Sequence, residues 1–347
     1  MRELKVGIMG LGWAGGAHVE MFGKVRGAAV AAVCTRRPLT ESAARRKYGL
    51  PLRVYRDYAD MLADPALDIV SICTRSPEHA AQAIAAARAG KHVVIEKPIA
   101  MNWRDAQAVA RAVEKAGVRS CVCFEVRFSR QFSAIKALVD AGKIGRIHLA
   151  EVDYYHGVGP WYPQVDWYMR AAGGGSSLLT AGCHAMDMLL WLMDEPVAEV
   201  TACATKSESP FFAGYEYPTT TVALLKFRSG RLGKCVSCID SLQPYTFRVH
   251  LLGSRGTVLD DKIMTRHFKS PAASRWEPLG EPLVDSGDVH DLPYAAQFQA
   301  FVDAVREDRP MPRTDIGAAL ETHRVCFAVE KAARSGKTVR LPARAEN

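Results

Sequence analysis

The sequence has no apolar run long enough to cross a membrane, which argues against a membrane-spanning protein. Dense basic clusters are also scarce, so the net charge of +8 favours anionic small ligands over nucleic acid. The residues 1–5 lead directly into a glycine-rich strand and turn, unlike a signal peptide. We therefore expect a cytoplasmic protein with no membrane and no nucleic-acid partner.

A cysteine framework is lacking too. The chain has nine cysteines in 347 residues, and several fall inside predicted strands. Cys121 and Cys123 share one face of a strand, and the pair Cys235 and Cys238 has no second pair at a metal-binding spacing. We interpret the cysteines as reduced thiols that pack as small hydrophobic side chains, and we expect no metal site.

Short apolar runs alternate with helical segments over residues 1–124. Ser76 is predicted to cap a helix that Gly90 terminates, and Asn102 is predicted to cap the next helix, which stops at Gly117. This alternation predicts an α/β Rossmann domain with a doubly wound parallel sheet. The predicted strands are residues 5–9, 28–34, 69–73, 93–96 and 118–124.

From residue 125 to residue 347 the pattern changes. Strands dominate after a long apolar helix that ends near Met193, and two helices close the chain. We predict a second domain of the α+β type with a large, mostly antiparallel sheet. Its predicted strands are residues 146–155, 197–204, 219–227, 231–237 and 247–252.

The first predicted strand runs into a G-x-G-x-x-G turn and then a helix, which is the context in which this motif indicates a dinucleotide site. The first glycine allows the tight turn, the second admits the pyrophosphate, and the third permits close packing of helix and strand. The turn residues expected to contact the cofactor are Gly10, Gly12, Trp13, Ala14 and Gly15.

The end of the second strand lacks the carboxylate that typically holds the ribose of NAD. Thr35, Arg36 and Arg37 stand there instead, and a hydroxyl followed by two guanidinium groups suits a 2′-phosphate. The alternative is that both arginines are solvated loop residues. We predict that NADP is favoured and that NAD is the other candidate.

Lys97 follows the apolar run 92–95, so it leaves the carboxyl end of a predicted parallel strand, where open α/β sheets bind ligands. Taken alone, such a lysine is as well explained as a solvated loop residue. Its sequence context gives it more weight. The chain resembles the glucose-fructose oxidoreductase/inositol dehydrogenase/rhizopine catabolism (Gfo/Idh/MocA) family over nearly its whole length. The motifs that carry the resemblance are the glycine turn at 10–15, the segment 89–98 with Glu96-Lys97-Pro98, Gly173-Gly174-Gly175 followed by Gly182-x-His184-x-x-Asp187, and the ending Gly336-Lys337-Thr338-Val339.

The resemblance implies that Lys97 hydrogen-bonds the reacting oxygen and that His184 is the acid/base histidine. Many family members have an aspartate four residues before this histidine, where this chain has Thr180. Thr180 is close to His184 in helical spacing but supplies no charge. Three alternatives follow: His184 works with less assistance, Lys97 carries more of the proton transfer, or the chemistry differs. Asp187 is a substitute orienter of His184 or a packing residue.

The remaining expected contacts surround these residues. Arg75 replaces a small residue or proline of the family, and either grips an anionic group or faces solvent. Aromatic residues of segment 161–168 stack on sugar faces or pack their loop, and Arg127 is better explained as an anchor than as a ligand. The expected cofactor contacts beyond the glycine turn are Thr35, Arg36, Arg37, Cys73, Thr74, Arg75, His79, Glu96 and Lys97. The expected substrate contacts are Lys97, Glu125, Arg127, Trp161, Asp166, Trp167, Thr180 and His184.

The resulting expectation is an NAD(P)-dependent oxidoreductase that transfers a hydride between a nicotinamide and a hydroxyl or carbonyl of a sugar, polyol or glycoside. Two other functions compete with it. One is a glycosidase or lyase that uses a tightly bound nicotinamide for transient oxidation, and the other is a non-catalytic dinucleotide-binding regulator. The resemblance also implies that the second domain, residues 125–347, binds substrate and forms oligomers. We expect a homodimer or homotetramer through the open face of its sheet.

Overall fold

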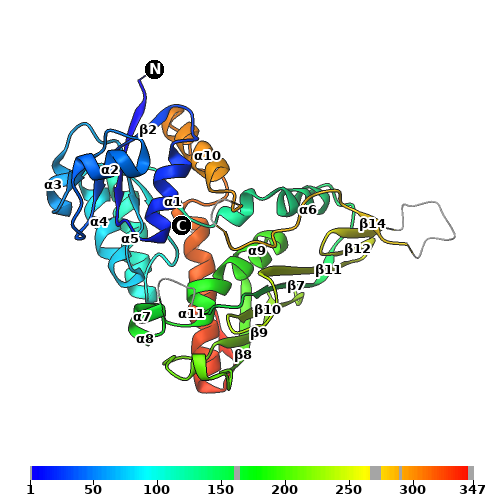
Figure 1. The fold of residues 1–347 in the computed structure, drawn as a ribbon. Helices are drawn as coiled ribbons and strands as arrows, with labels where there is room; N and C mark the ends of the chain where they lie inside the picture. Colours follow the sequence, from blue (N-terminus) through cyan, green and yellow to red (C-terminus); the bar gives the residue numbers. More distant parts are fainter. Residues whose placement is uncertain (1, 160–164, 266–274, 289–290, 343–347) are drawn as a thin grey trace. The chain divides into compact units, whose positions relative to one another are not determined.

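The computed structural model describes residues 2–159, 165–265, 275–288 and 291–342. It divides into two compact units (Figure 1). The first unit contains Met1–Glu125 and Val289–Glu321, and the second contains Val126–Asp288 and Thr322–Asn347. Helix α11 (Ile316–Ser335) and the short 3₁₀ helix η1 (Glu125–Phe128) begin in the first unit and end in the second.

The first unit is built on a sheet of six parallel strands in the order β3-β2-β1-β4-β5-β6. Its interior strands are short and apolar, and β4 and β5 are almost fully buried, as expected for strands covered on both faces. The elements of this unit are β1 (Leu4–Met9), α1 (Trp13–Phe22), β2 (Ala28–Cys34), α2 (Glu41–Tyr48), β3 (Arg53–Tyr55), α3 (Tyr58–Ala63), β4 (Ile69–Ile72), α4 (Ser76–Arg88), β5 (His92–Ile95), α5 (Trp103–Ala116), β6 (Ser120–Val122) and α10 (Tyr294–Arg306).

Helix ends in this unit follow local capping chemistry. The Asn102 side chain accepts a hydrogen bond from the Asp105 backbone N–H, and Gly117 is left-handed at the end of α5, as predicted. The predicted cap of α4 is wrong by one residue: Arg75 is the N-cap, and Ser76 is already helical. Pro77 favours this start, because its fixed φ suits the first turn of a helix.

Helix α10 belongs to the first unit although it lies far along the sequence. Figure 1 shows α10 beside α1. The Phe298 ring of α10 stacks on Phe22 of α1 at 4.2 Å between centroids, and both side chains are fully buried. The predicted division at residues 124 and 125 placed this helix in the C-terminal domain. The structure differs because an apolar face on α1 needs a partner, and α10 supplies it.

The second unit contains a nine-stranded sheet in the order β14-β13-β12-β11-β7-β10-β9-β8-β15. All neighbouring strands are antiparallel except β7 and β10. The elements of this unit are α6 (Arg130–Asp140), β7 (Ile147–Tyr155), α7 (Val165–Tyr168), α8 (Ala171–Gly174), the π-helix η2 (Leu178–Gly182), α9 (Cys183–Met193), β8 (Val197–Thr205), η3 (Pro210–Phe212), β9 (Thr220–Phe227), β10 (Leu232–Cys238), β11 (Thr246–Gly253), β12 (Gly256–Leu259), β13 (Lys262–Thr265), β14 (Glu277–Pro278) and β15 (Val339–Arg340).

Helix α9 packs on β7 and β10 and covers one face of this sheet. On β9, buried and exposed residues alternate strictly, which is the pattern of a strand with one covered face. Leu224 and Leu232 are 58% and 50% exposed, so the uncovered face carries large apolar side chains. The predicted fold class, a Rossmann domain followed by an α+β domain with a mostly antiparallel sheet, is confirmed. Among the helices that the structure describes, none is both long and apolar enough to traverse a bilayer.

Candidate active site

The turn between β1 and α1 has the shape of a phosphate cradle. Gly10 has a φ of +90°, and a Cβ on it would lie 2.8 Å from the carbonyl oxygen of Cys73. A Cβ on Gly15 would lie 1.9 Å from the carbonyl oxygen of Gly10. Around Gly12, in contrast, no atom of the described residues would come within 4 Å of an added Cβ. Two glycines thus permit close packing, and the third leaves space for a ligand.

Helix α1 begins directly at this space. Its N-cap is Gly12, its first turn carries no acidic side chain, and Trp13 at its start is 41% exposed. The N–H groups and the dipole of a helix N-terminus favour an anion. The turn and the helix therefore fit the pyrophosphate of a dinucleotide, which supports the predicted contacts at residues 10–15.

The loop after β2 is ordered around Thr35, which is buried and whose hydroxyl accepts from the backbone N–H of Arg37 at 3.1 Å. Arg36 and Arg37 are exposed. Arg56 donates to the carbonyl oxygens of Arg37 and Leu39, which holds the loop against the end of β3. The two arginines are thus presented at the carboxyl end of β2, where the adenosine ribose of a dinucleotide lies in this fold.

The residues after β4 face in different directions. The Cys73 thiol is buried against Nδ1 of His18 at 3.1 Å, and Thr74 donates its hydroxyl proton to Gln82 at 2.6 Å. His79 lies with Nδ1 2.7 Å from the carbonyl oxygen of Pro98 and Nε2 3.1 Å from that of Thr74. His79 thus braces the ends of β4 and β5 to each other, which favours a supporting role, and its direct contact with the cofactor stays a prediction. Of the three positions that follow β4, only Arg75 is exposed.

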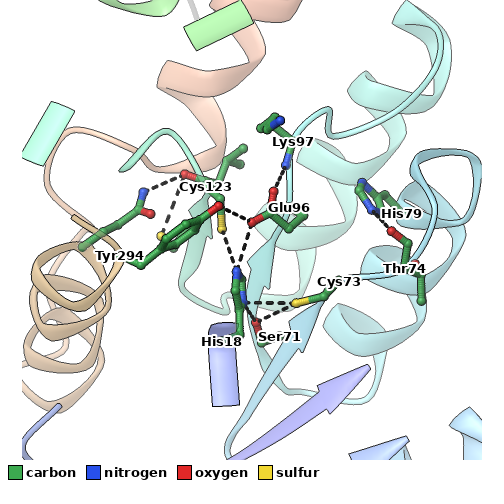
Figure 2. A network of polar contacts seen from close by, with 12 residues as sticks. His18, Ser71, Cys73, Thr74, His79, Glu96, Lys97, Cys123 and Tyr294 are labelled. Atoms are coloured by element: carbon green, nitrogen blue, oxygen red, sulfur yellow. Dashed lines mark hydrogen bonds and ion pairs between the residues drawn. The ribbon is translucent and has the colours of Figure 1, made fainter. Parts of the chain in front are cut away.

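Glu96 anchors the turn that carries Lys97 (Figure 2). Its Oε1 accepts from His18 Nε2 at 3.0 Å and from the Tyr294 hydroxyl at 2.9 Å, and its Oε2 accepts from the backbone N–H of Lys97 at 3.2 Å. The other nitrogen of His18 faces the hydroxyl of Ser71 at 2.7 Å. A carboxylate only accepts, so Nε2 of His18 carries a proton and Ser71 can donate to Nδ1. The backbone of Lys97 is therefore fixed by a buried polar network, while its side chain leaves the end of β5.

The network stabilises the ionised form of Glu96. Burial by itself would raise the pKa of this carboxyl, but the hydrogen bond from His18 and the electrostatic interaction with it, together with Lys97 and Tyr294, lower it from its ordinary 4.5 to about 2. Glu96 thus places a permanent negative charge beside Lys97. The polar atoms of Glu96 are used within the network, which favours a positioning role, and its predicted contact with the cofactor stays a prediction.

Because the Glu96 carboxylate is ionised in the folded protein, the free energy of unfolding is expected to depend on pH. Because the folded pKa lies below the unfolded one, the stabilisation is present above about pH 4.5 and is lost as the pH falls through about 2. Glu96→Gln is expected to lower the free energy of unfolding by about 3 kcal/mol at pH 7 and by much less near pH 3. Denaturant unfolding at both pH values measures this difference. The exposed Glu114→Gln on α5 is the control, and equal losses at both pH values for Glu96→Gln would contradict the account.

His18, Glu96 and Cys123 also form a group of metal-ligand type, with their ligand atoms within 4.8 Å of one another. The carboxylate is already satisfied by its hydrogen bonds to His18 and Tyr294. Burial also raises the pKa of the Cys123 thiol well above its ordinary value, which disfavours the thiolate that a metal requires. These contacts explain the group as a hydrogen-bond network.

In the second unit, His184 lies at the start of α9, and Thr180 lies in the preceding π-helix η2. Both residues are buried. Thr180 donates its hydroxyl proton to the carbonyl oxygen of Ser176 at 2.8 Å. A π-helical turn widens the helix, so the four-residue spacing used to relate Thr180 to His184 does not apply unchanged across η2. A Cβ on Gly182 would lie 2.3 Å from the Ser237 Cβ, so this glycine allows η2 to approach β10.

Asp187 is a packing residue by its contacts. Both of its oxygens bind the guanidinium of Arg127, each at 2.6 Å, and Thr322 donates its hydroxyl to the same carboxylate at 2.7 Å. Asp187 is fully buried, and Arg127 also lies over the Trp191 ring. Bidentate pairs of this kind fix their partners in position. The contacts favour the anchor interpretation of Arg127, and its predicted contact with substrate stays a prediction.

The predicted substrate segment is described only in part, because Trp161 lies outside the described residues. Asp166 is exposed and Trp167 is partly exposed on α7. The glycine triplet of the motif explains how α7 packs: a Cβ on Gly173 would lie 2.1 Å from the carbonyl oxygen of Trp167. Gly173 of the triplet therefore allows close packing against the backbone of Trp167. Glu125, at the end of the first unit, is buried.

Sequence reasoning missed His18, Tyr294 and Glu78 of α4. His18 had a weak signal, since it follows the glycine turn on α1. Tyr294 is 198 positions away from Glu96 in the sequence, and Glu78 is 42 positions away from Arg36. Local patterns report the burial of a residue and not its distant partner, so neither contact had a sequence signal.

The parallel sheet, the glycine-rich turn and the open helix N-terminus are the features of a dinucleotide-binding domain. Residues 4–124 match a family model described as "Oxidoreductase family, NAD-binding Rossmann fold", and residues 132–259 match the GFO/IDH/MocA C-terminal domain. The chain belongs to the Gfo/Idh/MocA oxidoreductase family, as the sequence motifs indicated.

Individual relatives agree with this assignment. Myo-inositol 2-dehydrogenase of Thermotoga maritima is 30% identical over 75% of this chain and 76% of its own length. Scyllo-inositol 2-dehydrogenase (NAD(+)) of Bacillus subtilis is 25% identical over 98% of this chain and 96% of its own. The crystal structure of the WlbA dehydrogenase from Bordetella pertussis with NADH and UDP-GlcNAcA matches with a TM-score of 0.82 and 26% identity over 99% and 100% of the two chains. The prediction of an NAD(P)-dependent oxidoreductase is confirmed.

Proposed function

We propose that this protein is a dehydrogenase that oxidises a secondary hydroxyl group of a cyclic polyol or sugar, with Lys97 and His184 acting on the reacting oxygen. The observation that carries the proposal is the anchoring of Lys97 by the buried Glu96 network at the end of β5, in a dinucleotide-binding domain. The similarity to two inositol dehydrogenases supports the substrate class.

Lys97 and His184 have different roles in the oxidation of the alcohol. Lys97 donates a hydrogen bond to the reacting oxygen, and its positive charge stabilises the alkoxide character that develops there. His184 accepts the hydroxyl proton, since histidine is a side chain that commonly acts as a general base. A nicotinamide bound in this domain would supply the hydride acceptor for the carbinol carbon. The cradle at residues 10–15 and the first turn of α1 hold the pyrophosphate.

The two competing functions remain chemically distinct. The presence of both Lys97 and His184 argues against a non-catalytic regulator. Thr180 in place of an aspartate leaves a glycosidase or lyase as an alternative function, because elimination chemistry tolerates a different arrangement of the catalytic base. A panel of inositols, hexoses and glycosides separates the three functions. Reduced nicotinamide that accumulates with a polyol supports the dehydrogenase. Product without net cofactor change supports the glycosidase, and inertness with cofactor still bound supports the regulator.

The proposal also favours NADP(H) over NAD(H), on the basis of Arg36 and Arg37 at the end of β2. Arg36→Asp is expected to weaken NADPH binding by roughly 10-fold or more, because a charge-assisted bond to the phosphate is replaced by repulsion. NADH binding is expected to change much less. Fluorescence titration with both reduced cofactors measures the ratio, and Arg111→Asp on the exposed surface of α5 is the control. An unchanged ratio would remove the NADP assignment.

Self-association through the uncovered face of the second sheet completes the proposal. Val222, Leu224 and Leu232 are 40%, 58% and 50% exposed on neighbouring strands β9 and β10. Large apolar side chains on an uncovered sheet face favour burial against another chain. A monomer in light scattering at micromolar concentration would contradict the expected homodimer or homotetramer.

A further inference from the structure

The loop after β2 contacts a carboxylate that the sequence of β2 does not provide. The Arg36 guanidinium donates to Oε1 of Glu78 at 2.8 Å. Glu78 lies in the first turn of α4, which follows β4. In the sheet order, β2 and β4 are the two neighbours of β1. The ion pair thus joins the segments that flank the glycine turn, where the adenosine end of a dinucleotide binds in this fold.

Glu78 is held at this place by further hydrogen bonds. Its Oε2 accepts from Nε2 of Gln82 at 3.1 Å, and Oε1 of Gln82 accepts from the hydroxyl of Thr74 at 2.6 Å. A continuous chain of bonds therefore runs from Arg36 to the end of β4. The side chain of Glu78 is 30% exposed and that of Arg36 is 76% exposed, so a ligand can reach both.

The two side chains prefer different cofactors. A carboxylate accepts hydrogen bonds from the 2′- and 3′-hydroxyl groups of the NAD ribose, and a guanidinium binds the 2′-phosphate of NADP. For NADP, Arg36 must leave Glu78 and the phosphate must approach a like charge. For NAD, Arg36 can stay paired while Glu78 keeps acceptor capacity for a hydroxyl.

We infer that Glu78 determines the cofactor preference of the enzyme: it competes with the 2′-phosphate for Arg36 and accepts the ribose hydroxyls of NAD. This inference rests on the proposed nicotinamide-dependent activity and adds a residue from α4 to it. It predicts that a chain with two arginines at the end of β2 can bind both cofactors. In a simpler role, Glu78 would only stabilise the first turn of α4 as an acidic residue near the helix N-terminus. Its replacement would then change the stability of the helix and not the cofactor preference.

The test is a titration of the full-length protein with NADPH and with NADH, followed by the fluorescence of the reduced nicotinamide. Glu78→Gln is expected to tighten NADPH about fivefold, the upper range for an exposed charge pair. It is expected to weaken NADH about threefold or more, because the charged acceptor is lost. The ratio of the two Kd values then shifts by roughly 15-fold or more toward NADPH.

A double-mutant cycle with Arg36→Ala tests whether Glu78 acts on NADPH binding through Arg36. The gain in NADPH affinity on Glu78→Gln is expected to shrink in the Arg36→Ala background, because there is no arginine left to release. Glu41→Gln is the matched control, since it removes the same charge from the first turn of the neighbouring α2. Thermal unfolding of each variant reports separately any stabilisation of α4.

The outcomes are distinguishable. A ratio that changes less than about twofold in Glu78→Gln, or changes equally in Glu41→Gln, overturns the inference while the proposed function stands. Wild-type protein that binds neither cofactor overturns both. A shift in the ratio toward NADPH that depends on Arg36 supports the inference.

Discussion

Lys97→Met is expected to lower kcat by about 10²–10³-fold, the usual cost of removing one donor that stabilises a developing oxyanion. Methionine keeps the unbranched stem of the side chain up to the ε position and removes the ammonium group with its charge and its hydrogen bonds. The network of Glu96, His18 and Tyr294 contacts the backbone at position 97, so the turn is expected to survive the substitution. The loss is therefore expected in kcat and kcat/KM together, because the interaction strengthens in the transition state.

Steady-state kinetics with saturating cofactor measure this loss. Cofactor affinity, followed by fluorescence titration, reports whether the dinucleotide site is intact in the variant. Lys115→Met on the exposed last turn of α5 is the control. A Lys97→Met enzyme with near-normal kcat would remove Lys97 from the mechanism.

His184→Asn is expected to lower kcat by about 10²–10⁴-fold, because general-base transfer of the hydroxyl proton is lost. Asparagine is similar in size and retains hydrogen bonding at the start of α9, and it cannot accept and release a proton near neutral pH. The limb of the pH–rate profile that reports the histidine is expected to disappear with it. His148→Asn, at an exposed position of β7, is the control.

The comparison of these two variants decides whether His184 or Lys97 transfers the proton, which is the question that Thr180 in place of an aspartate leaves open. If His184 transfers the proton, both substitutions are severe and only His184→Asn flattens the pH–rate profile. If Lys97 carries the proton instead, His184→Asn retains most of kcat and its profile keeps the limb. The second outcome would contradict the division of roles proposed for the two residues.

Much of the fold was accessible from the sequence because its elements have local causes. Buried parallel strands are continuous apolar runs, so β2 was predicted at its observed bounds. Asn102 and Gly117 carry their own capping chemistry, so both ends of α5 were predicted correctly. The short strand β3 has three residues and no such pattern, and it was not predicted.

The site residues were likewise predictable only where their positions have local causes. Glycine positions follow from backbone geometry, and the structure gives Gly10 and Gly15 the close contacts that the motif requires. The anchoring of Lys97 was not accessible, because Glu96 finds its partners on α1 and α10, and no periodicity relates these helices. Glu78 had no sequence signal for a similar reason: the motif places its carboxylate at the end of β2, while the structure supplies one from α4.

The most direct test of hydride transfer uses a polyol labelled with deuterium at the carbinol carbon and the oxidised cofactor in excess. The account predicts that the accepted inositol or sugar transfers one deuterium to the nicotinamide, seen by mass spectrometry of the released reduced cofactor, and that Lys97→Met slows this transfer. Product that forms while the released cofactor stays oxidised and free of deuterium would contradict it.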